Sequence, residues 1–273
     1  MNVQFTERRP AFPLMSYVQT YWQGDFNTSN EEKFSQSVLP NGCVEIIIHL
    51  TSDHCALSEN GKTWNVSPEF TLLGVYDKPY DVVFDQNVKV FGIRLFPDGM
   101  ANIFGVPPKL IMSSFENVND VFGDDFRVFS SKIRDLKDFD DQVALANQFI
   151  GKKLSNNIKS YDYTHLAMEL IRKTNGLENY NDLVNQVPIS QRQLQREFKN
   201  LYGISIRDYM RLARLNAIHE YMQNNAAKLT ALSYDLNFTD QSHLIKEYKT
   251  FSGVTPKALL KNRGAYIINT GSE

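Results

Sequence analysis

This sequence has few cysteines and no long apolar run, and its first residues do not resemble a secretion signal. Its 273 residues include two cysteines, Cys43 and Cys55, which fit a reducing compartment. No run of about 18 apolar residues occurs, so no membrane-spanning helix is expected. Charged residues at positions 7–9 stand where a signal peptide would need an apolar segment. We therefore expect an intracellular, cytoplasmic protein with no membrane partner.

Catalytic and metal-binding motifs are also missing. The sequence has no G-x-S-x-G, Walker or G-x-G-x-x-G motif, and an isolated carboxylate such as Glu45 defines no acid/base pair. Cys43, His49, His54 and Cys55 lie close together, but the paired spacing of structural zinc ligands is absent. His49 lies in an apolar β run, where a hydrogen-bonded core histidine is expected. We predict no enzyme activity, no metal and no cofactor.

The composition is that of a globular protein with enough length for two domains. Hydrophobic residues make up 42% of the chain and charged residues 22%. The net charge of −2 is unevenly distributed: residues 1–160 carry 15 basic and 20 acidic side chains, and residues 161–273 carry 14 and 11. Contact with nucleic acid is therefore expected from the C-terminal part.

The first 110 residues predict a β-rich domain, either a small barrel or a sandwich. Short β-branched and aromatic runs are separated by Gly, Pro, Asn and Asp; these runs are CVEIIIHL (43–50), FTLLGVY (70–76), YDVVF (80–84) and VKVFGIRLF (88–96). From about residue 98 to 155 the pattern turns helical, with Phe126, Phe129, Ile133 and Leu136 at spacings of three and four.

A polar stretch divides the chain into two predicted domains. We expect the linker at Lys152, Lys153, Ser155, Asn156 and Asn157. The division is then a β-rich domain with C-terminal helices at 1–155 and an all-helical domain at 159–266. The predicted fold class is α+β, with a barrel-like domain followed by an all-α domain.

An internal repeat is the most informative feature of the helical part. Shifting the chain by 50 residues places LQREFKNLYGIS (194–205) over LIKEYKTFSGVT (244–255). Both copies have an apolar stripe at helical spacing and end at a glycine suited to a left-handed C-cap, Gly203 and Gly253. A single polar helix face is usually just solvated, but solubility does not explain its repetition.

Each copy follows a short apolar helix and a tight turn. In the first, NDLVNQ leads through VPIS to a helix capped by Ser190, and Pro188 breaks the preceding helix. In the second, LTALSYDL leads through NFT to a helix capped by Thr239 or Asp240, with Asn237 at the break. A helix, a short turn and a polar helix form a helix-turn-helix, so two such units are predicted.

The segment at 205–225 predicts a long helix between the two units. A helix of about 20 residues spans roughly 30 Å. One turn of B-DNA is about 34–36 Å, so this spacer can hold two recognition helices in successive major grooves.

These residues resemble the AraC-type (AraC/XylS) transcription regulators over roughly 165–263. The motifs that carry the resemblance are S-x-x-x-L-Q-R-x-F-K (190–199), Y-G-I-S (202–205), Y-M-R and R-L (209–215), F-T-D-Q-S (238–242) and G-V-T-P (253–256). L-P-N-G-C-V-E-I-I (39–47) and G-I-R-L-F-P-D-G-M-A-N-I-F-G-V-P (92–107) are similar to a β-rich sensor domain found before some such regulators. The resemblance implies a cupin-like first domain that senses a ligand, mediates dimerisation, or does both.

Several positions depart from the family pattern. Pro188 and Asn237 stand where the turns usually have Gly, and Val184 and Ser233 replace small Ala residues. In the second recognition helix, Leu244 and Tyr248 replace Phe, and Lys246 replaces Arg. We expect the fold to survive, with weaker base reading by the second helix because lysine lacks arginine's bidentate fork.

The recognition helices carry side chains suited to base edges and phosphates. Arg pairs with guanine O6/N7 and Gln with adenine N6/N7. Six residues at the helix N-termini are predicted to read bases: Arg192, Gln195, Arg196, Gln241, Ser242 and Lys246. Ile245 is placed to contact a thymine methyl. Phosphate contacts are predicted for Ser190, Lys199, Arg207, Thr239, Lys249 and Lys257, although a solvated or acid-paired lysine is an open alternative.

The expected partners follow from the regulator class. They are double-stranded promoter DNA, a small-molecule effector, RNA polymerase and a second copy of the chain. Trp22, Tyr76, Tyr80 and Phe91 are candidates for a ligand pocket, against the alternative that they are core. Another reading is a degenerate regulator that acts through protein contacts without specific DNA binding. The sequence does not decide between activation and repression. We expect an activator.

Overall fold

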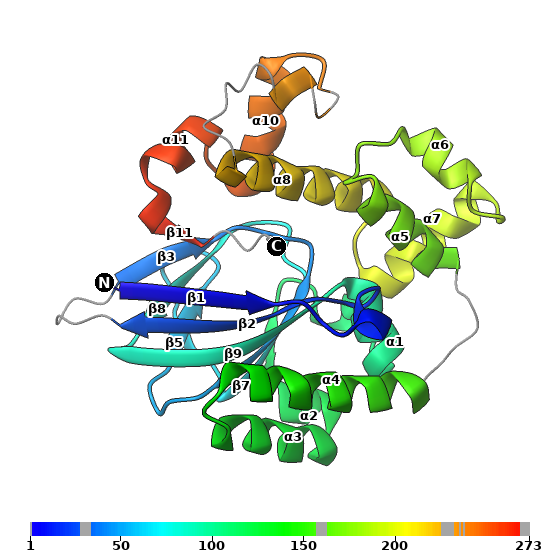
Figure 1. The fold of residues 1–273 in the computed structure, drawn as a ribbon. Helices are drawn as coiled ribbons and strands as arrows, with labels where there is room; N and C mark the ends of the chain where they lie inside the picture. Colours follow the sequence, from blue (N-terminus) through cyan, green and yellow to red (C-terminus); the bar gives the residue numbers. More distant parts are fainter. Residues whose placement is uncertain are drawn as a thin grey trace.

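The computed structural model describes residues 2–27, 34–156, 163–224, 232–234, 236 and 238–267. A β-rich domain with helices precedes an all-helical domain, which confirms the predicted fold class (Figure 1). The domain boundaries at 155 and 159 stay a prediction. No helix among the residues described has the length and apolar character needed to cross a membrane.

Two sheets form the β-rich domain. The six-stranded sheet has the order β1 (Asn2–Arg8), β2 (Val18–Asn27), β9 (Asn87–Leu95), β4 (Val44–His49), β7 (Phe70–Leu73) and β10 (Phe115–Asn117). The five-stranded sheet has the order β11 (Tyr266–Ile267), β3 (Phe34–Val38), β8 (Tyr80–Phe84), β5 (Cys55–Ser58) and β6 (Asn65–Val66). Neighbouring strands pair antiparallel except β11, which joins β3 in parallel from the far end of the chain.

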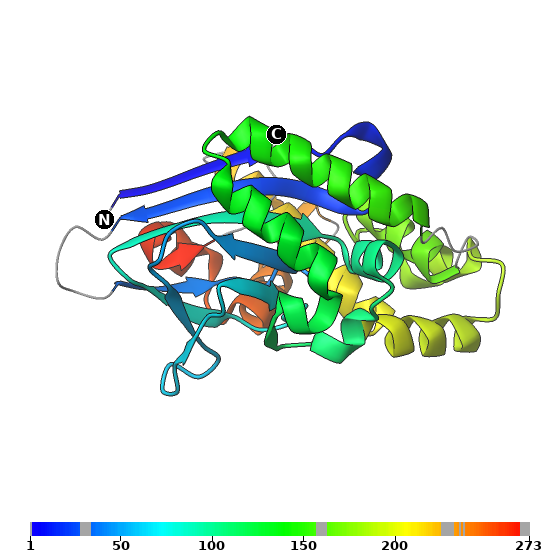
Figure 2. The same cartoon turned by 90° about the horizontal axis from the view of Figure 1, so that it is seen from below.

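The central strands of the six-stranded sheet are buried on both faces. One face meets the other sheet around a core that includes Trp22, Phe84 and Val90. The opposite face is covered by helices, which Figure 2 shows lying across the strands. These helical elements are η1 (Phe12–Leu14), α1 (Pro97–Phe104), η2 (Pro108–Ile111), α2 (Val118–Phe122), α3 (Asp124–Asp135) and α4 (Phe139–Asn156). The helical region predicted between residues 98 and 155 is therefore confirmed, with the short strand β10 inside it.

Helix α4 runs further than the sequence predicted. Lys152, Lys153, Ser155 and Asn156 were expected in a linker, but they form its last turns. The reason is that Leu154 continues the buried stripe of this helix and packs against the core between helices and sheet. Asn157, the last residue of the expected linker, lies outside the described residues.

The helical domain contains α5 (Tyr163–Lys173), α6 (Tyr180–Asn185), α7 (Gln191–Tyr202), α8 (Ile206–Asn224), α10 (Gln241–Ser252), α11 (Pro256–Lys261) and η3 (Arg263–Ala265). The predicted long helix is α8, whose 19 residues span about 28 Å at 1.5 Å per residue. Figure 1 shows α8 running between a lobe formed by α5, α6 and α7 and a lobe formed by α10 and α11. Its position therefore sets the relative placement of α7 and α10.

Candidate DNA-reading surface and ligand cavity

The first helix-turn-helix unit consists of α6, a turn at 186–190 and α7. The side chain of Ser190 accepts a hydrogen bond from Gln193 N at 3.2 Å, which confirms the predicted N-cap. Leu194 and Phe198 are completely buried, so one face of α7 is fixed against the domain core. Pro188 lies exposed in the turn and leaves the arrangement intact.

The second unit places α10 in the same way. Residues 232–234 are helical, and α10 begins after Asp240, whose Oδ1 accepts a hydrogen bond from His243 N at 2.8 Å. Of the two predicted caps, Asp240 is therefore the one that bonds, and Thr239 is exposed beside it. Leu244 and Tyr248 are completely buried, as predicted for core positions. Asn237 lies outside the described residues.

The repeat extends from sequence to structure at a constant shift of 50 residues. Matching polar groups cap the two recognition helices, matching glycines end them in the left-handed conformation, and matching hydroxyls cap the helices that follow. The pairs are Ser190 and Asp240, Gly203 and Gly253, and Ser205 and Thr255. A side-chain pair four residues apart also recurs on each recognition helix, Gln193 with Glu197 and His243 with Glu247.

Two of the three predicted base readers on α7 stand free. Arg192 and Arg196 are exposed, and neither forms an ion pair with any described residue. Gln195 is exposed as well, but its amide donates a hydrogen bond to the hydroxyl of Tyr180 in α6. Tyr180, which the sequence analysis did not single out, therefore orients one predicted reader.

The predicted readers on α10 differ in exposure. Ser242 and Lys246 are exposed, whereas Gln241, the first residue of α10, and Ile245, one turn further on, are half-buried. Five of the six predicted readers, all except Gln241, are thus exposed on α7 and α10. Their contact with bases stays a prediction.

The candidate phosphate ligands lie around the same surface. Ser190, Lys199, Thr239, Lys249 and Lys257 are exposed, and the three lysines have no acidic partner within the described part of the chain. The guanidinium of Arg207 lies 3.7 Å from the ring centroid of Tyr180, so a cation–π contact holds its position.

Helix α10 is tied to α8 by a charge cluster that sequence reasoning missed. Glu247 Oε1 lies 3.2 Å from Arg214 Nη2 and 3.8 Å from Arg211 Nε, both on α8. The guanidinium of Arg211 also lies 4.7 Å from the ring centroid of Phe251. These arginines are therefore engaged within the domain, and they hold α10 at a defined angle to the joining helix.

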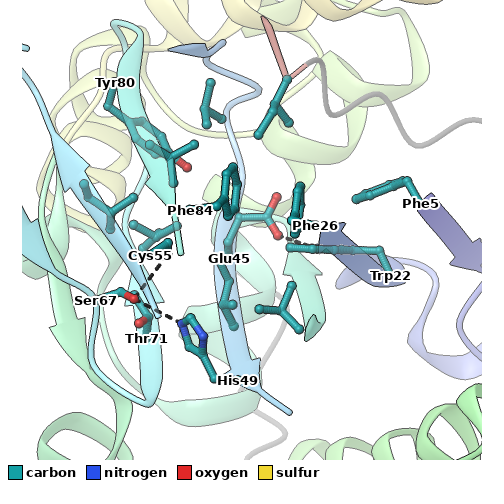
Figure 3. A pocket seen from close by; sticks show the side chains of 17 residues that line it. Phe5, Trp22, Phe26, Glu45, His49, Cys55, Ser67, Thr71, Tyr80 and Phe84 are labelled. Atoms are coloured by element: carbon teal, nitrogen blue, oxygen red, sulfur yellow. Dashed lines mark hydrogen bonds between the residues drawn. The ribbon is translucent and has the colours of Figure 1, made fainter. Parts of the chain in front are cut away.

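A cavity lies between the two sheets of the β-rich domain (Figure 3). It offers about 60 Å³ to the centres of water molecules, enough for roughly four to six water-sized groups at 10–15 Å³ each. Its lining is mainly apolar and includes Phe5, Phe26, Leu73, Val82 and Ile267. Because Ile267 belongs to β11, the C-terminal segment forms part of the cavity wall.

Two of the four aromatic residues predicted for a pocket line this cavity. Trp22 and Tyr80 face into it, and the ring of Tyr76 lies behind Tyr80 at a centroid distance of 4.6 Å. Phe91 is buried on the other face of the sheet, where it packs against Phe139. Adjacent side chains of a strand point to opposite faces of the sheet, so Val90 lines the cavity and Phe91 does not.

Polar groups occupy two places in the cavity wall. Glu45 accepts hydrogen bonds from Trp22 Nε1 at 2.9 Å and from Arg94 Nε at 2.5 Å, and Arg94 is completely buried. His49 Nε2 lies 3.1 Å from Ser67 Oγ. A ligand in this cavity therefore meets apolar walls and two fixed polar points.

The histidine end of the cavity supplies hydrogen bonds rather than a nucleophile. Ser67 Oγ also lies 3.1 Å from Cys55 Sγ, which gives a linked cysteine, serine and histidine. Burial lowers the pKa of His49 to about 4 and raises the pKa of the Cys55 thiol to about 11. At neutral pH both groups are uncharged, so no thiolate–imidazolium pair forms. Within the described residues, no group of three or more His, Cys, Asp or Glu side chains is arranged to hold a metal ion.

Two helix-turn-helix units joined by one helix define the class of DNA-binding proteins with paired recognition helices. The comparison of sequences agrees: residues 183–262 match a family described as a helix-turn-helix domain, which is of the AraC type. The chain thus carries the AraC-type DNA-binding domain of transcription regulators behind a β-rich N-terminal domain. Residues 6–115 match a family described as a domain of unknown function, DUF6597.

Comparison with solved structures finds similar chains at low sequence identity. ToxT from Vibrio cholerae is 14% identical with a TM-score of 0.49, over 88% of this chain and 98% of that one. A fatty-acid-bound ToxT structure from the same organism gives 15% and 0.49, over 93% and 96%. The AraC-like transcriptional activator CuxR gives 10% and 0.31, over 96% and 84%. Among curated proteins, none matches significantly.

Proposed function

We propose that this protein is a sequence-specific transcription regulator that reads two successive major grooves of promoter DNA and is controlled by a small ligand. The observation that carries the proposal is the structural repeat of two capped helices with exposed polar side chains. These are Arg192, Gln195 and Arg196 on α7, and Ser242 and Lys246 on α10. We further propose that it works in the cytoplasm.

Unpaired charge supports DNA as the partner of the recognition surface. Arg192 and Arg196 have no acidic neighbour within ion-pair distance among the described residues. Two arginines held by an N-capped helix can each donate two hydrogen bonds to a guanine edge. The alternative regulator without DNA binding would have its basic face occupied by acidic side chains, and the described part of α7 lacks that arrangement.

The spacing of the two units supports reading of two grooves. Helix α8 separates them with a length of about 28 Å, close to the roughly 34 Å between successive major grooves on one face of DNA. The cluster around Glu247 fixes α10 against α8. Two recognition helices on a rigid support match DNA without the entropy of ordering a flexible linker.

The cavity supports control by a small molecule. Its apolar walls favour a compact apolar ligand, and Glu45 and His49 with Ser67 offer hydrogen bonds that orient one or two polar groups. The ligand would alter how the two domains are placed on DNA. RNA polymerase and a second copy of the chain are the further partners proposed for a regulator of this kind.

A salt series of DNA binding tests the proposal. Wild type, Arg196→Ala and the control Arg127→Ala, an exposed arginine on α3, are titrated against the upstream fragment of the gene and a scrambled fragment. We expect wild type and the control to prefer the upstream fragment. Arg196→Ala should lose that preference with little change in the salt slope, because base contacts give specificity and phosphate contacts give salt dependence. Equal binding of both fragments by wild type at low salt would contradict the proposal.

A further inference from the structure

The turn at 39–42 packs directly against helix α8. It joins β3 to β4, and Leu39 is buried in the core of the helical domain rather than in a core of its own domain. Gly42 has a φ of +73°, and a Cβ built there would lie 3.3 Å from the ring of Tyr209 and 3.6 Å from Leu212 Cβ. A side chain at Gly42 would be strained by the positive φ and crowded by Tyr209, so glycine suits the packing of this turn against α8.

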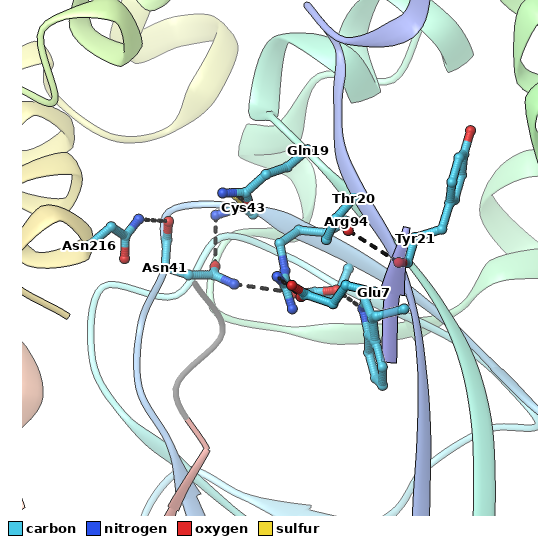
Figure 4. A network of polar contacts seen from close by, with 10 residues as sticks. Glu7, Gln19, Thr20, Tyr21, Asn41, Cys43, Arg94 and Asn216 are labelled. Atoms are coloured by element: carbon cyan, nitrogen blue, oxygen red, sulfur yellow. Dashed lines mark hydrogen bonds and ion pairs between the residues drawn. The ribbon is translucent and has the colours of Figure 1, made fainter. Parts of the chain in front are cut away.

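Asn41 in this turn bonds to both domains at once (Figure 4). The backbone carbonyl of Asn41 accepts a hydrogen bond from Asn216 Nδ2 on α8 at 2.6 Å. Its side chain donates to Glu45 Oε1 at 3.2 Å and accepts from Cys43 N at 2.9 Å. Asn41 therefore connects α8 of the DNA-binding domain to Glu45 at the start of strand β4.

The other side of Glu45 belongs to the cavity. Glu45 Oε2 accepts the hydrogen bond of Trp22 Nε1, and both residues line the cavity. Arg94 binds Oε1 and also lies 3.2 Å from Glu7 Oε1 through Nη1. A carboxylate held by this many donors in a buried site moves only together with its partners, because an unpaired buried charge is costly.

We propose that Asn41 and Asn216 form a positioning pair that transmits occupancy of the cavity to α8. This inference rests on the proposed function. A ligand that displaces Trp22 or Glu45 changes the support of Asn41, and Asn216 passes the change to the helix that spaces the two recognition helices. Further polar contacts join the domains. Those of Asp98 with Arg172 and His165 start from α1, which contributes no residue to the cavity. On β3, Gln36 donates a hydrogen bond to Gly264 O, away from α8.

Thermodynamic reciprocity makes the proposal testable without knowing the ligand. If the cavity influences DNA binding, DNA must influence the cavity by the same free energy. Trp22 and Trp64 are the two tryptophans of the chain, and Trp64 is 38% exposed. In a Trp64→Phe background, Trp22 is therefore the sole indole and reports the state of the cavity through its emission and its quenching by acrylamide.

The experiment adds a selected high-affinity DNA duplex to this background protein and to Asn216 variants. We expect DNA to shift the Trp22 signal. Asn216→Ala and Asn216→Leu, which keeps the branched side chain without its polar atoms, should lose the shift while still binding DNA by anisotropy. Asn147→Ala is the matched control, since that amide accepts from Ala11 N and Tyr21 OH on the face away from α8. It should keep the shift. Trp22 emission that DNA binding leaves unchanged, or a full shift of that emission in both Asn216 variants, would overturn the proposal.

A second measurement decides the inference even if no DNA is bound, which would count against the proposed function alone. Trp22→Phe removes the donor to Glu45, and Asn216→Ala removes the donor to Asn41. We expect the unfolding free energies of these two substitutions to be non-additive in a double-mutant cycle, because Glu45 and Asn41 link them. The control cycle of Trp22→Phe with Asn147→Ala should be additive. Additivity in the first cycle would refute the coupling.

Discussion

Arg172 of α5 donates a hydrogen bond to Asp98 of α1 at 2.7 Å, and Asp98 is completely buried. The second carboxylate oxygen of Asp98 lies 2.5 Å from His165 Nδ1, also on α5. The guanidinium of Arg172 further lies 4.3 Å from the ring centroid of Phe96. This cluster anchors the helical domain to the β-rich domain at a point separate from the turn at 39–42.

Loss of the Asp98 carboxylate should destabilise the protein strongly. We expect Asp98→Ala to lower the free energy of unfolding by about 3–5 kcal/mol, because Arg172 is left buried without its partner. Urea denaturation measures the change. The exposed pair of Asp124 and Arg127 provides the control, and Asp124→Ala should cost less than about 1 kcal/mol. Equal costs at the two sites would show that the Asp98 cluster does not carry the junction.

The two helix caps, Ser190 and Asp240, should contribute equally to the free energy of unfolding because they occupy equivalent positions in the repeat. Ser190→Ala and Asp240→Ala each remove a side-chain acceptor for a helix N–H, and each should cost about 1 kcal/mol of unfolding free energy. Thr239→Ala tests the specificity of the second effect, since Thr239 is exposed next to the cap and should be nearly neutral. A larger loss in Thr239→Ala than in Asp240→Ala would contradict the assigned cap.

Substitutions of base-reading and phosphate-binding side chains on α7 should have different effects on DNA binding. Arg192→Ala is expected to cost about 1–3 kcal/mol of affinity for the preferred site and to relax specificity at one position. Lys199→Ala should weaken binding to all sequences alike and lower the salt slope by about 1. Titrations at several salt concentrations separate the two patterns. Reversed behaviour of the two variants would place the groove-facing side of α7 elsewhere.

Acid should destabilise the protein through buried histidines. Burial lowers the pKa of His49 to about 4 and that of His219 to about 3, whereas an unfolded histidine titrates near 6.5. Between these values the unfolded chain binds more protons, so stability is complete above about pH 6.5 and falls as the pH drops towards 4. For His49 the loss is roughly 3 kcal/mol at 1.4 kcal/mol per pH unit.

Denaturation at a series of pH values checks this dependence. His49→Gln should flatten the fall in stability between pH 6.5 and 4, because glutamine does not titrate. His243→Gln is the control, since His243 is exposed on α10. An unchanged pH profile in His49→Gln would show that His49 does not contribute to acid sensitivity.

A filled cavity should no longer respond to small apolar molecules. In the Trp64→Phe background, 1-hexanol and benzyl alcohol are titrated while Trp22 emission is followed. We expect saturable changes that Val82→Phe removes, because the added ring occupies the cavity that Val82 lines. Val128→Phe, on the exposed side of α3, should leave the response unchanged. A response that persists in Val82→Phe would place the binding site elsewhere.

Local patterns were sufficient to predict the recognition helices. The cap at Ser190, the terminal glycines and the buried stripe at Leu194 and Phe198 depend on residues within one helix, and the 50-residue repeat doubled each signal. The strands β4, β7, β8 and β9 were also predicted, since each is a short run rich in β-branched and aromatic residues. Strand β2 was missed because two of its adjacent residues, Tyr21 and Trp22, are both buried, on opposite faces of the sheet. The polar residues around them hide the alternation of buried and exposed side chains expected of a strand.

Contacts between the domains could not be read from the sequence. Asn41 looked like a turn residue, and its bond to Asn216 joins positions 175 residues apart. Asp98 lies just after the predicted strand run at 88–96, and its bond to Arg172 spans 74 residues. Likewise, the choice between Val90 and Phe91 for the cavity depends on which sheet face the helices cover. These outcomes are set by tertiary packing, and no local periodicity reports them.

Methylation protection on DNA tests the central claim most directly. The protein is bound to the tightest sequence selected from a randomised duplex, and guanine N7 reactivity in the major groove is mapped for wild type and Arg196→Ala. Two clusters of protected guanines about 10 base pairs apart are predicted, and Arg196→Ala should lose one cluster while keeping the other. A single cluster in the wild type, or the loss of both in Arg196→Ala, would contradict the reading of two successive major grooves by α7 and α10.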